Sequence, residues 1–206
     1  MPALKGSLSY TRLFVDGDLP KNFRDQFTKS IRLRAMKPLE PDEEALERAG
    51  WCVIGEPFDV ELDYENVFYN EYLNLGYRTD KWMIPSALLR AKVREAEAAQ
   101  LGRKGRERLS RQEKTELKET VVKRLRKQLA PATRVVDLSW SLDEGVVRFF
   151  SQSERAVLAM SDLFHRTFGM NLVPEAPYTL AARLGLSKAA ETAWQALEAT
   201  SLAVEA

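Results

Sequence analysis

The sequence predicts an α+β fold with antiparallel sheet, helices packed on one face of it, and a long basic helical hairpin. Three observations support this prediction. Short runs rich in aromatic and β-branched residues occur on both sides of the middle of the chain, each group with an amphipathic helix. Between them, residues 84–130 form a charged stretch with helical spacing. The 206 residues are 45% hydrophobic and 30% charged, as in globular proteins.

The N-terminal part of the chain is expected to form strands around one basic helix. Residues 7–15 read as a first strand, and Pro20 opens a helix in which Phe23, Phe27 and Ile31 are spaced four apart. A short acidic helical piece and four further strands follow. They are expected at residues 42–48, then 50–55, 58–62, 67–70 and 72–78.

Residues 84–130 are expected to form two antiparallel helices. Pro85 suits the first helical position, and Gly102 is placed to end the first helix in a left-handed cap. Ser110 and Glu113 have the spacing of a capping box that starts the second helix. An apolar stripe then recurs at four-residue intervals. Its members are Leu117, Val121, Leu125 and Leu129.

The positive charge of the chain is concentrated in this hairpin. Residues 84–129 hold fourteen Lys and Arg against six Glu, whereas the whole chain has a net charge of only +1. Such a segment indicates an anionic partner, most often nucleic acid. The alternative is that these charges only solvate long exposed helices. The predicted DNA contacts are Arg103, Lys104, Arg106, Arg108, Lys114, Lys118, Lys123, Arg124 and Lys127.

The C-terminal part returns to strands and helices. Residues 133–140 alternate as a strand and pair with residues 146–150 across the turn at residues 143–145. Ser151 or Ser153 caps a helix that Gly169 stops. The buried face of that helix is expected to be Val157, Met160, Phe164 and Phe168, with a short strand at 171–173 after it.

The chain is expected to comprise an α+β region and an alanine-rich C-terminal helix. The first spans residues 1–180, with the hairpin at 84–130 projecting from it, and the second spans residues 181–206 with Ser187 as its cap. No run of eighteen apolar residues occurs in the sequence, and the single Cys52 cannot form an internal disulfide. These features indicate a cytoplasmic protein without a membrane partner.

The sequence offers little for catalysis. With one His and one Cys, the usual zinc site cannot be made, and no glycine-rich phosphate loop joins a strand to a helix. We therefore expect no enzyme, no cofactor, no metal and no small-molecule substrate. One alternative stays open, because Asp59, Glu61, Asp63 and Glu65 would share a face of a strand and could hold magnesium in a nuclease. Charges that block edge pairing would explain the same pattern.

Several short motifs occur in a fixed order along the chain. They are Trp-Met-Ile-Pro-Ser-Ala-Leu-Leu at 82–89, Gly-Arg-Lys at 102–104 and Leu-Ser-Arg-Gln-Glu-Lys-Thr-Glu-Leu-Lys-Glu at 109–119. Trp140, Asp-Glu-Gly at 143–145, Glu-Arg-Ala at 154–156, Phe-Gly-Met at 168–170 and Leu-Val-Pro-Glu at 172–175 follow. Together with Tyr-Thr-Arg-Leu at 10–13, Gly-Trp at 50–51 and Ser151, this set resembles the recombination-associated protein RdgC family of bacteria over roughly residues 7–180.

The resemblance implies a nucleoid-associated, double-stranded DNA-binding protein without strong sequence preference. Proteins of that family form a ring-shaped homodimer around the duplex and restrain recombinase loading. They carry a substantial further region after the segment similar to residues 172–174, where this sequence has only a short alanine-rich piece. The resemblance thus implies a shortened or diverged member that binds DNA as an open dimer or a ring, or that binds something else.

A second hypothesis comes from a different class of protein. The mixed Glu and Lys of residues 107–119 resemble the flank of a coiled coil, where such charges pair across an interface. The hairpin would then mediate self-association or docking on a protein partner.

Overall fold

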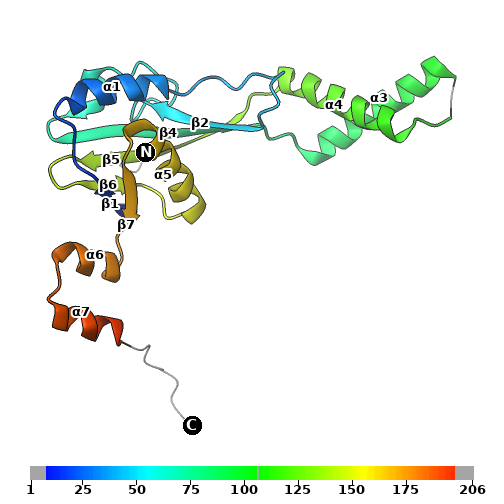
Figure 1. Ribbon diagram of the computed structural model, residues 1–206. Helices are drawn as coiled ribbons and strands as arrows, with labels where there is room; N and C mark the ends of the chain where they lie inside the picture. Colours follow the sequence, from blue (N-terminus) through cyan, green and yellow to red (C-terminus); the bar gives the residue numbers. More distant parts are fainter. Residues whose placement is uncertain (1–7, 106, 198–206) are drawn as a thin grey trace, which may run out of the picture.

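The computed structural model describes residues 8–105 and 107–197. In this part of the chain it contains seven strands and seven helices (Figure 1). The strands are β1 (Thr11–Asp16), β2 (Glu47–Cys52), β3 (Phe68–Tyr69), β4 (Tyr72–Lys81), β5 (Ala132–Ser141), β6 (Val146–Phe149) and β7 (Asn171–Pro174). The helices are α1 (Phe23–Leu33), α2 (Tyr64–Val67), α3 (Ser86–Lys104), α4 (Arg111–Gln128), α5 (Glu154–Phe168), α6 (Pro177–Leu184) and α7 (Lys188–Gln195).

All the strands belong to one antiparallel sheet. Its order is β2-β4-β5-β6-β1-β7, and the short β3 pairs with β4. The longest ladder joins β4 to β5 from Tyr72↔Ser141 to Lys81↔Ala132. The mixed helix and strand content and the antiparallel sheet confirm the coarse fold prediction.

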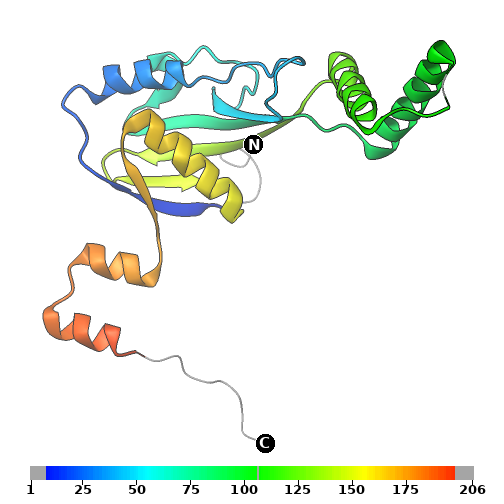
Figure 2. The same cartoon turned by 45° about the vertical axis from the view of Figure 1, so that its right-hand side comes forward.

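The main core lies between one face of the sheet and helices α1 and α5 (Figure 2). Alternation in β5 turns Leu138 and Trp140 to this face, where they are almost fully buried. The Phe27 ring of α1 lies 5.5 Å from the Trp140 ring, and the Phe168 ring of α5 lies 5.3 Å from it. These contacts confirm the apolar faces predicted for both helices.

The opposite face carries a buried polar cluster. Arg78 donates from Nε to Asp80 Oδ1 at 2.9 Å, and Thr133 donates to the same oxygen at 2.9 Å. Cys52 is buried beside them and donates to the Gly76 carbonyl. Burial raises the pKa of the Cys52 thiol from its usual 9.0 to about 12, so this cysteine stays protonated at neutral pH.

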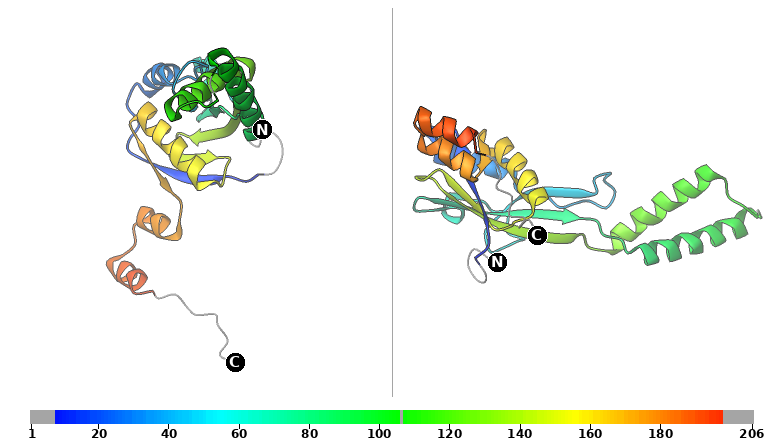
Figure 3. Two further views of the ribbon diagram at one scale, coloured as in Figure 1. Left: turned by 90° about the vertical axis from the view of Figure 1, so that its right-hand side faces the viewer. Right: turned by 90° about the horizontal axis from the view of Figure 1, so that it is seen from below.

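Helices α3 and α4 lie side by side and extend away from the sheet (Figure 3). We call α3, α4 and the connection between them the α3–α4 arm. The capping box predicted for the second helix is present, because Ser110 Oγ accepts from Glu113 N and Glu113 accepts from Ser110 N. The predicted end of the first helix was wrong: α3 runs through Gly102, and Gly105 forms the left-handed cap with φ 60°.

Two other local predictions were wrong, and the helices α2 and α6 were not predicted. Residues 58–62 form turns and irregular structure, because their backbone bonds close local turns such as Asp59 N to Glu56 O and Leu62 N to Val60 O. Residues 42–46 contain no helix, and Glu47 already belongs to β2. An additional helix, α6, begins at Pro177.

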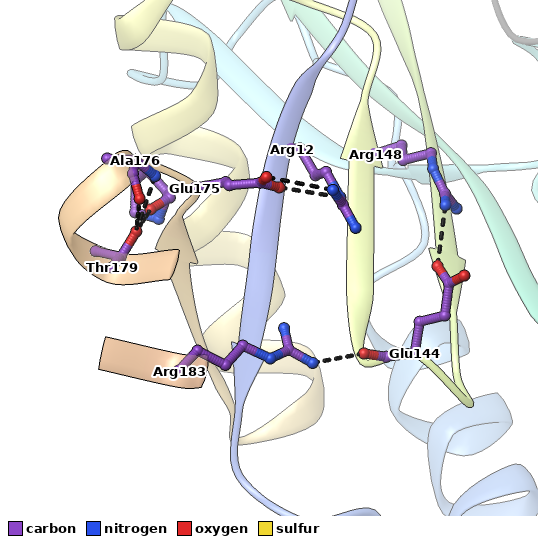
Figure 4. A network of polar contacts seen from close by, with 8 residues as sticks. Arg12, Glu144, Arg148, Glu175, Ala176, Thr179 and Arg183 are labelled. Carbon is purple, nitrogen blue, oxygen red and sulfur yellow. Dashed lines mark hydrogen bonds and ion pairs between the residues drawn. The ribbon is translucent and has the colours of Figure 1, made fainter. Parts of the chain in front are cut away.

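The C-terminal helices attach to the sheet through β7 and α6 (Figure 4). The Arg12 and Glu175 side chains form an ion pair, with Nε 3.0 Å from Oε2. Arg183 of α6 donates to the Glu144 carbonyl at 2.7 Å and lies over the Phe14 ring. Among the described residues of α6 and α7, none is buried.

Within the described residues, none of the helices combines the length and the hydropathy needed to cross a membrane.

Candidate nucleic-acid interface

The predicted DNA contacts lie on the α3–α4 arm, but they differ in their surroundings. Arg103, Arg108, Lys114, Lys118 and Lys123 are exposed. None of these five side chains has a hydrogen bond or ion pair with another residue of the described part of the chain. Among the described residues, the arm therefore presents five exposed cations without a direct partner. The side chain of Lys104 and the whole of Arg106 lie outside the described residues.

Arg124 lies where α4 faces α3. It lines a hollow of about 250 Å³ together with Lys92 and Glu95 of α3. A hydrogen bond from Lys92 Nζ, 2.8 Å from Glu95 Oε2, lowers the pKa of the Glu95 carboxyl, and the charge of Arg124 contributes to this effect. Arg124 thus lies near a carboxylate of α3 that is already paired with Lys92.

Lys127 is compensated, because its Nζ lies 2.9 Å from Asp42 Oδ2. The neighbouring Arg126, which a helical wheel directs away from the apolar stripe, is instead buried. It donates to the Glu43 carbonyl at 2.8 Å, and its guanidinium lies 5.8 Å from the centre of the Trp82 ring. These contacts fasten the end of α4 to the segment before β2.

Two further hollows carry cations of the arm. At the end of the arm far from the sheet, Arg108 and Lys114 line a hollow of about 320 Å³ together with Glu97 and Glu107. Lys118 faces a more open hollow of about 660 Å³ that contains Leu89 and Val93 of α3. The stripe predicted for α4 is only partly covered, since Val121 and Leu125 are buried and Leu117 is half-buried.

A second group of cations lies at the base of the arm, where the sequence pattern predicted no site. Lys81, Arg134 and Arg155 line a hollow of about 310 Å³ between the ends of β4 and β5 and the first turn of α5. A signal was present in the sequence. Arg134 precedes the alternating Val136, Leu138 and Trp140, so the period of the strand turns it to the same face.

The carboxylates considered for a nuclease do not converge. Asp59 accepts a hydrogen bond from Glu61 N within a local turn, whereas Asp63 pairs with Arg32 of α1. The strand that would align them is absent from residues 58–62. No group of three or more His, Cys, Asp or Glu suited to a metal ion occurs among the described residues.

Comparison with known proteins found no relative of this chain: no protein-family model matches the sequence, and a search of curated proteins gave no match.

Proposed function

We propose that this protein binds double-stranded DNA without sequence preference, through a long basic helical hairpin formed by the α3–α4 arm. The proposal includes a role in DNA recombination or replication, with the protein located on the nucleoid, as the resemblance to the RdgC family suggests. It also includes a homodimer, in which two arms would contact one duplex from two sides.

The observation that supports the proposal is the set of five exposed cations on the α3–α4 arm that form no hydrogen bond or ion pair with the described residues. Lysine and arginine side chains of this kind displace condensed counterions from DNA phosphates. Such contacts position a protein on the duplex but carry no base information.

The test is fluorescence anisotropy of a labelled random-sequence duplex at several salt concentrations. We expect affinity to fall steeply with salt for the natural chain. In a triple variant, Arg103→Gln, Arg108→Gln and Lys114→Gln, the slope of log affinity against log salt should decrease by about 2 to 3, because each lost phosphate contact removes about 0.9.

A matched control replaces three exposed cations outside the arm: Lys29→Gln, Lys37→Gln and Lys188→Gln. This variant changes the net charge by the same amount and should keep the slope of the natural chain. If both triple variants lose the same slope, or neither does, the proposed place of the interface is wrong.

A second candidate function is docking of the arm on a protein, including another copy of this chain. It is favoured by α3, where none of the described side chains is buried and Leu89 and Val93 face an open hollow. Apolar residues left partly uncovered on a helix pair are typical of an interface. Under this alternative, the natural chain would self-associate in light scattering but would not bind the labelled duplex. The variant Val93→Glu would then abolish the self-association.

A further inference from the structure

The hollow at the base of the arm is formed by neighbouring strands and a helix. The register of β4 and β5 places Tyr77 opposite Val136 and Thr79 opposite Arg134. The first turns of α5 close one side with Arg155. Figure 1 shows β4 and β5 continuing beyond α5 toward the arm. The hollow thus lies at the end of the main core, on the same face of the sheet.

The charges around this hollow are unbalanced. Three cations line it, and the one carboxylate among its lining residues, Glu47, pairs with Lys81 at 3.1 Å. Within the described part of the chain, the side chains of Arg134 and Arg155 have no hydrogen bond or ion pair. Guanidinium groups bind carboxylates and phosphates in bidentate geometry, so two unpaired arginines on one hollow favour such an anion.

The remaining lining of the hollow is mainly apolar. Val136 and Tyr77 are buried and form its floor, and the small Ala156 and Ala159 form the wall from α5. Burial raises the pKa of the Tyr77 phenol, so the floor carries no charge of its own near neutral pH. At about 310 Å³, the volume suits a small ligand.

We propose that this hollow binds a small organic anion, with a phosphate or carboxylate group held by Arg134 and Arg155 and a flat apolar body resting on Tyr77 and Val136. Ser153 at the start of α5 can add a hydroxyl donor, because its Oγ already accepts from Ala156 N and its own proton is available. The inference does not rest on DNA binding, since none of these residues belongs to the α3–α4 arm.

The test uses phenyl phosphate as the probe, with isothermal titration calorimetry on the full chain. Benzoate replaces the phosphate by a carboxylate, inorganic phosphate omits the apolar body, and phenol omits the charge. We expect phenyl phosphate or benzoate to bind at least about tenfold more tightly than inorganic phosphate or phenol, because each half of the probe supplies only part of the contacts. The tighter of the two probes identifies the anion that the arginines prefer.

Substitutions of the lining residues test whether the probe binds in this hollow. Arg134→Gln and Arg155→Gln should each weaken the binding of the preferred probe by about tenfold or more. Ala159→Leu, at an exposed position of α5, should block binding by filling the hollow. Arg166→Gln is the matched control, because Arg166 lies on the same helix but pairs with Asp162 and does not line the hollow.

The proposal is overturned if neither organic anion binds at millimolar concentration. It is also overturned if the Arg134→Gln, Arg155→Gln double variant keeps full affinity while circular dichroism shows it folded. The triple variant of the arm should bind the preferred probe as the natural chain does. Failure of DNA binding and failure of this site are therefore separate results.

Discussion

Two glycines close together on α3 have different backbone conformations. Gly102 is helical and has no atom within 4 Å of the place where a Cβ would lie, whereas Gly105 has φ 60° and ends the helix. A side chain at residue 102 only lowers the conformational entropy of the unfolded chain. A side chain at residue 105 forces a non-glycine residue to adopt the left-handed backbone conformation. The same substitution should therefore have opposite effects at the two positions.

We expect Gly102→Ala to stabilise α3 by about 0.5–1 kcal/mol, the usual difference in helix propensity. Amide hydrogen exchange in α3 should slow by about two- to fivefold. Gly105→Ala is the comparison and should accelerate exchange in the last turn, since an L residue with positive φ costs about 1–2 kcal/mol. Faster exchange in Gly102→Ala would mean that the helix ends at Gly102 after all.

At the scale of elements, side-chain contacts join the end of α4 to the segment before β2. Arg126 provides a buried contact there, through the Glu43 carbonyl and the Trp82 ring. The exposed pair of Lys127 and Asp42 lies beside it and contributes little, because water screens such pairs. The orientation of α4 relative to the segment before β2 thus depends mainly on one arginine.

We expect Arg126→Met, which keeps much of the side-chain volume, to loosen this attachment. The loss of a hydrogen bond from a charged donor costs about 1.5–3 kcal/mol. Hydrogen exchange should become faster by tenfold or more in the last turn of α4 and in residues 42–46. The β4–β5 ladder should keep its protection, and Lys127→Met should change neither region. Uniform loss of protection would instead show that Arg126 supports the whole fold.

These elements show what the sequence could and could not predict. The periods of α1, α5 and β5 identified the core face, because Phe27, Phe168 and Trp140 follow local patterns that packing only completes. The burial of Arg126 could not be predicted in this way, since the carbonyl that accepts its hydrogen bond belongs to Glu43, far away in the sequence. Likewise, the hollow with Arg134 and Arg155 exists only through the placement of α5 on the sheet.

At the scale of the whole molecule, charge is divided between the arm and the rest. Outside residues 84–129 the chain holds 17 Lys and Arg against 24 Asp and Glu, so the rest of the chain is acidic while the arm is basic. A polyanion such as DNA would be attracted to the arm and repelled by most of the sheet region. Under the proposed function, this division of charge favours an encounter in which the arm contacts the duplex first.

The helices α6 and α7 contribute unequally to the molecule. Arg183 of α6 covers the Phe14 ring, with its guanidinium 4.2 Å from the ring centre. It also donates to the Glu144 carbonyl (Figure 4). The described residues of α7 include none that is buried, and Leu184, just before the link between the helices, is also exposed. The sheet therefore depends on α6 more than on α7.

We expect a chain that ends at Gly185 to unfold within about 1 °C of the full chain, because the described part of α7 buries no side chain on the sheet. Arg183→Ala in the full chain should lower the unfolding temperature by about 2–4 °C, as expected for the loss of about 1 kcal/mol in a chain of this size. Differential scanning calorimetry measures both, with light scattering to follow the mass. If the shortened chain melts several degrees lower, or if the full chain is a dimer and the shortened chain a monomer, then α7 docks on the sheet or on a second copy. The apolar side chains that α7 exposes in this structure would then be interface residues.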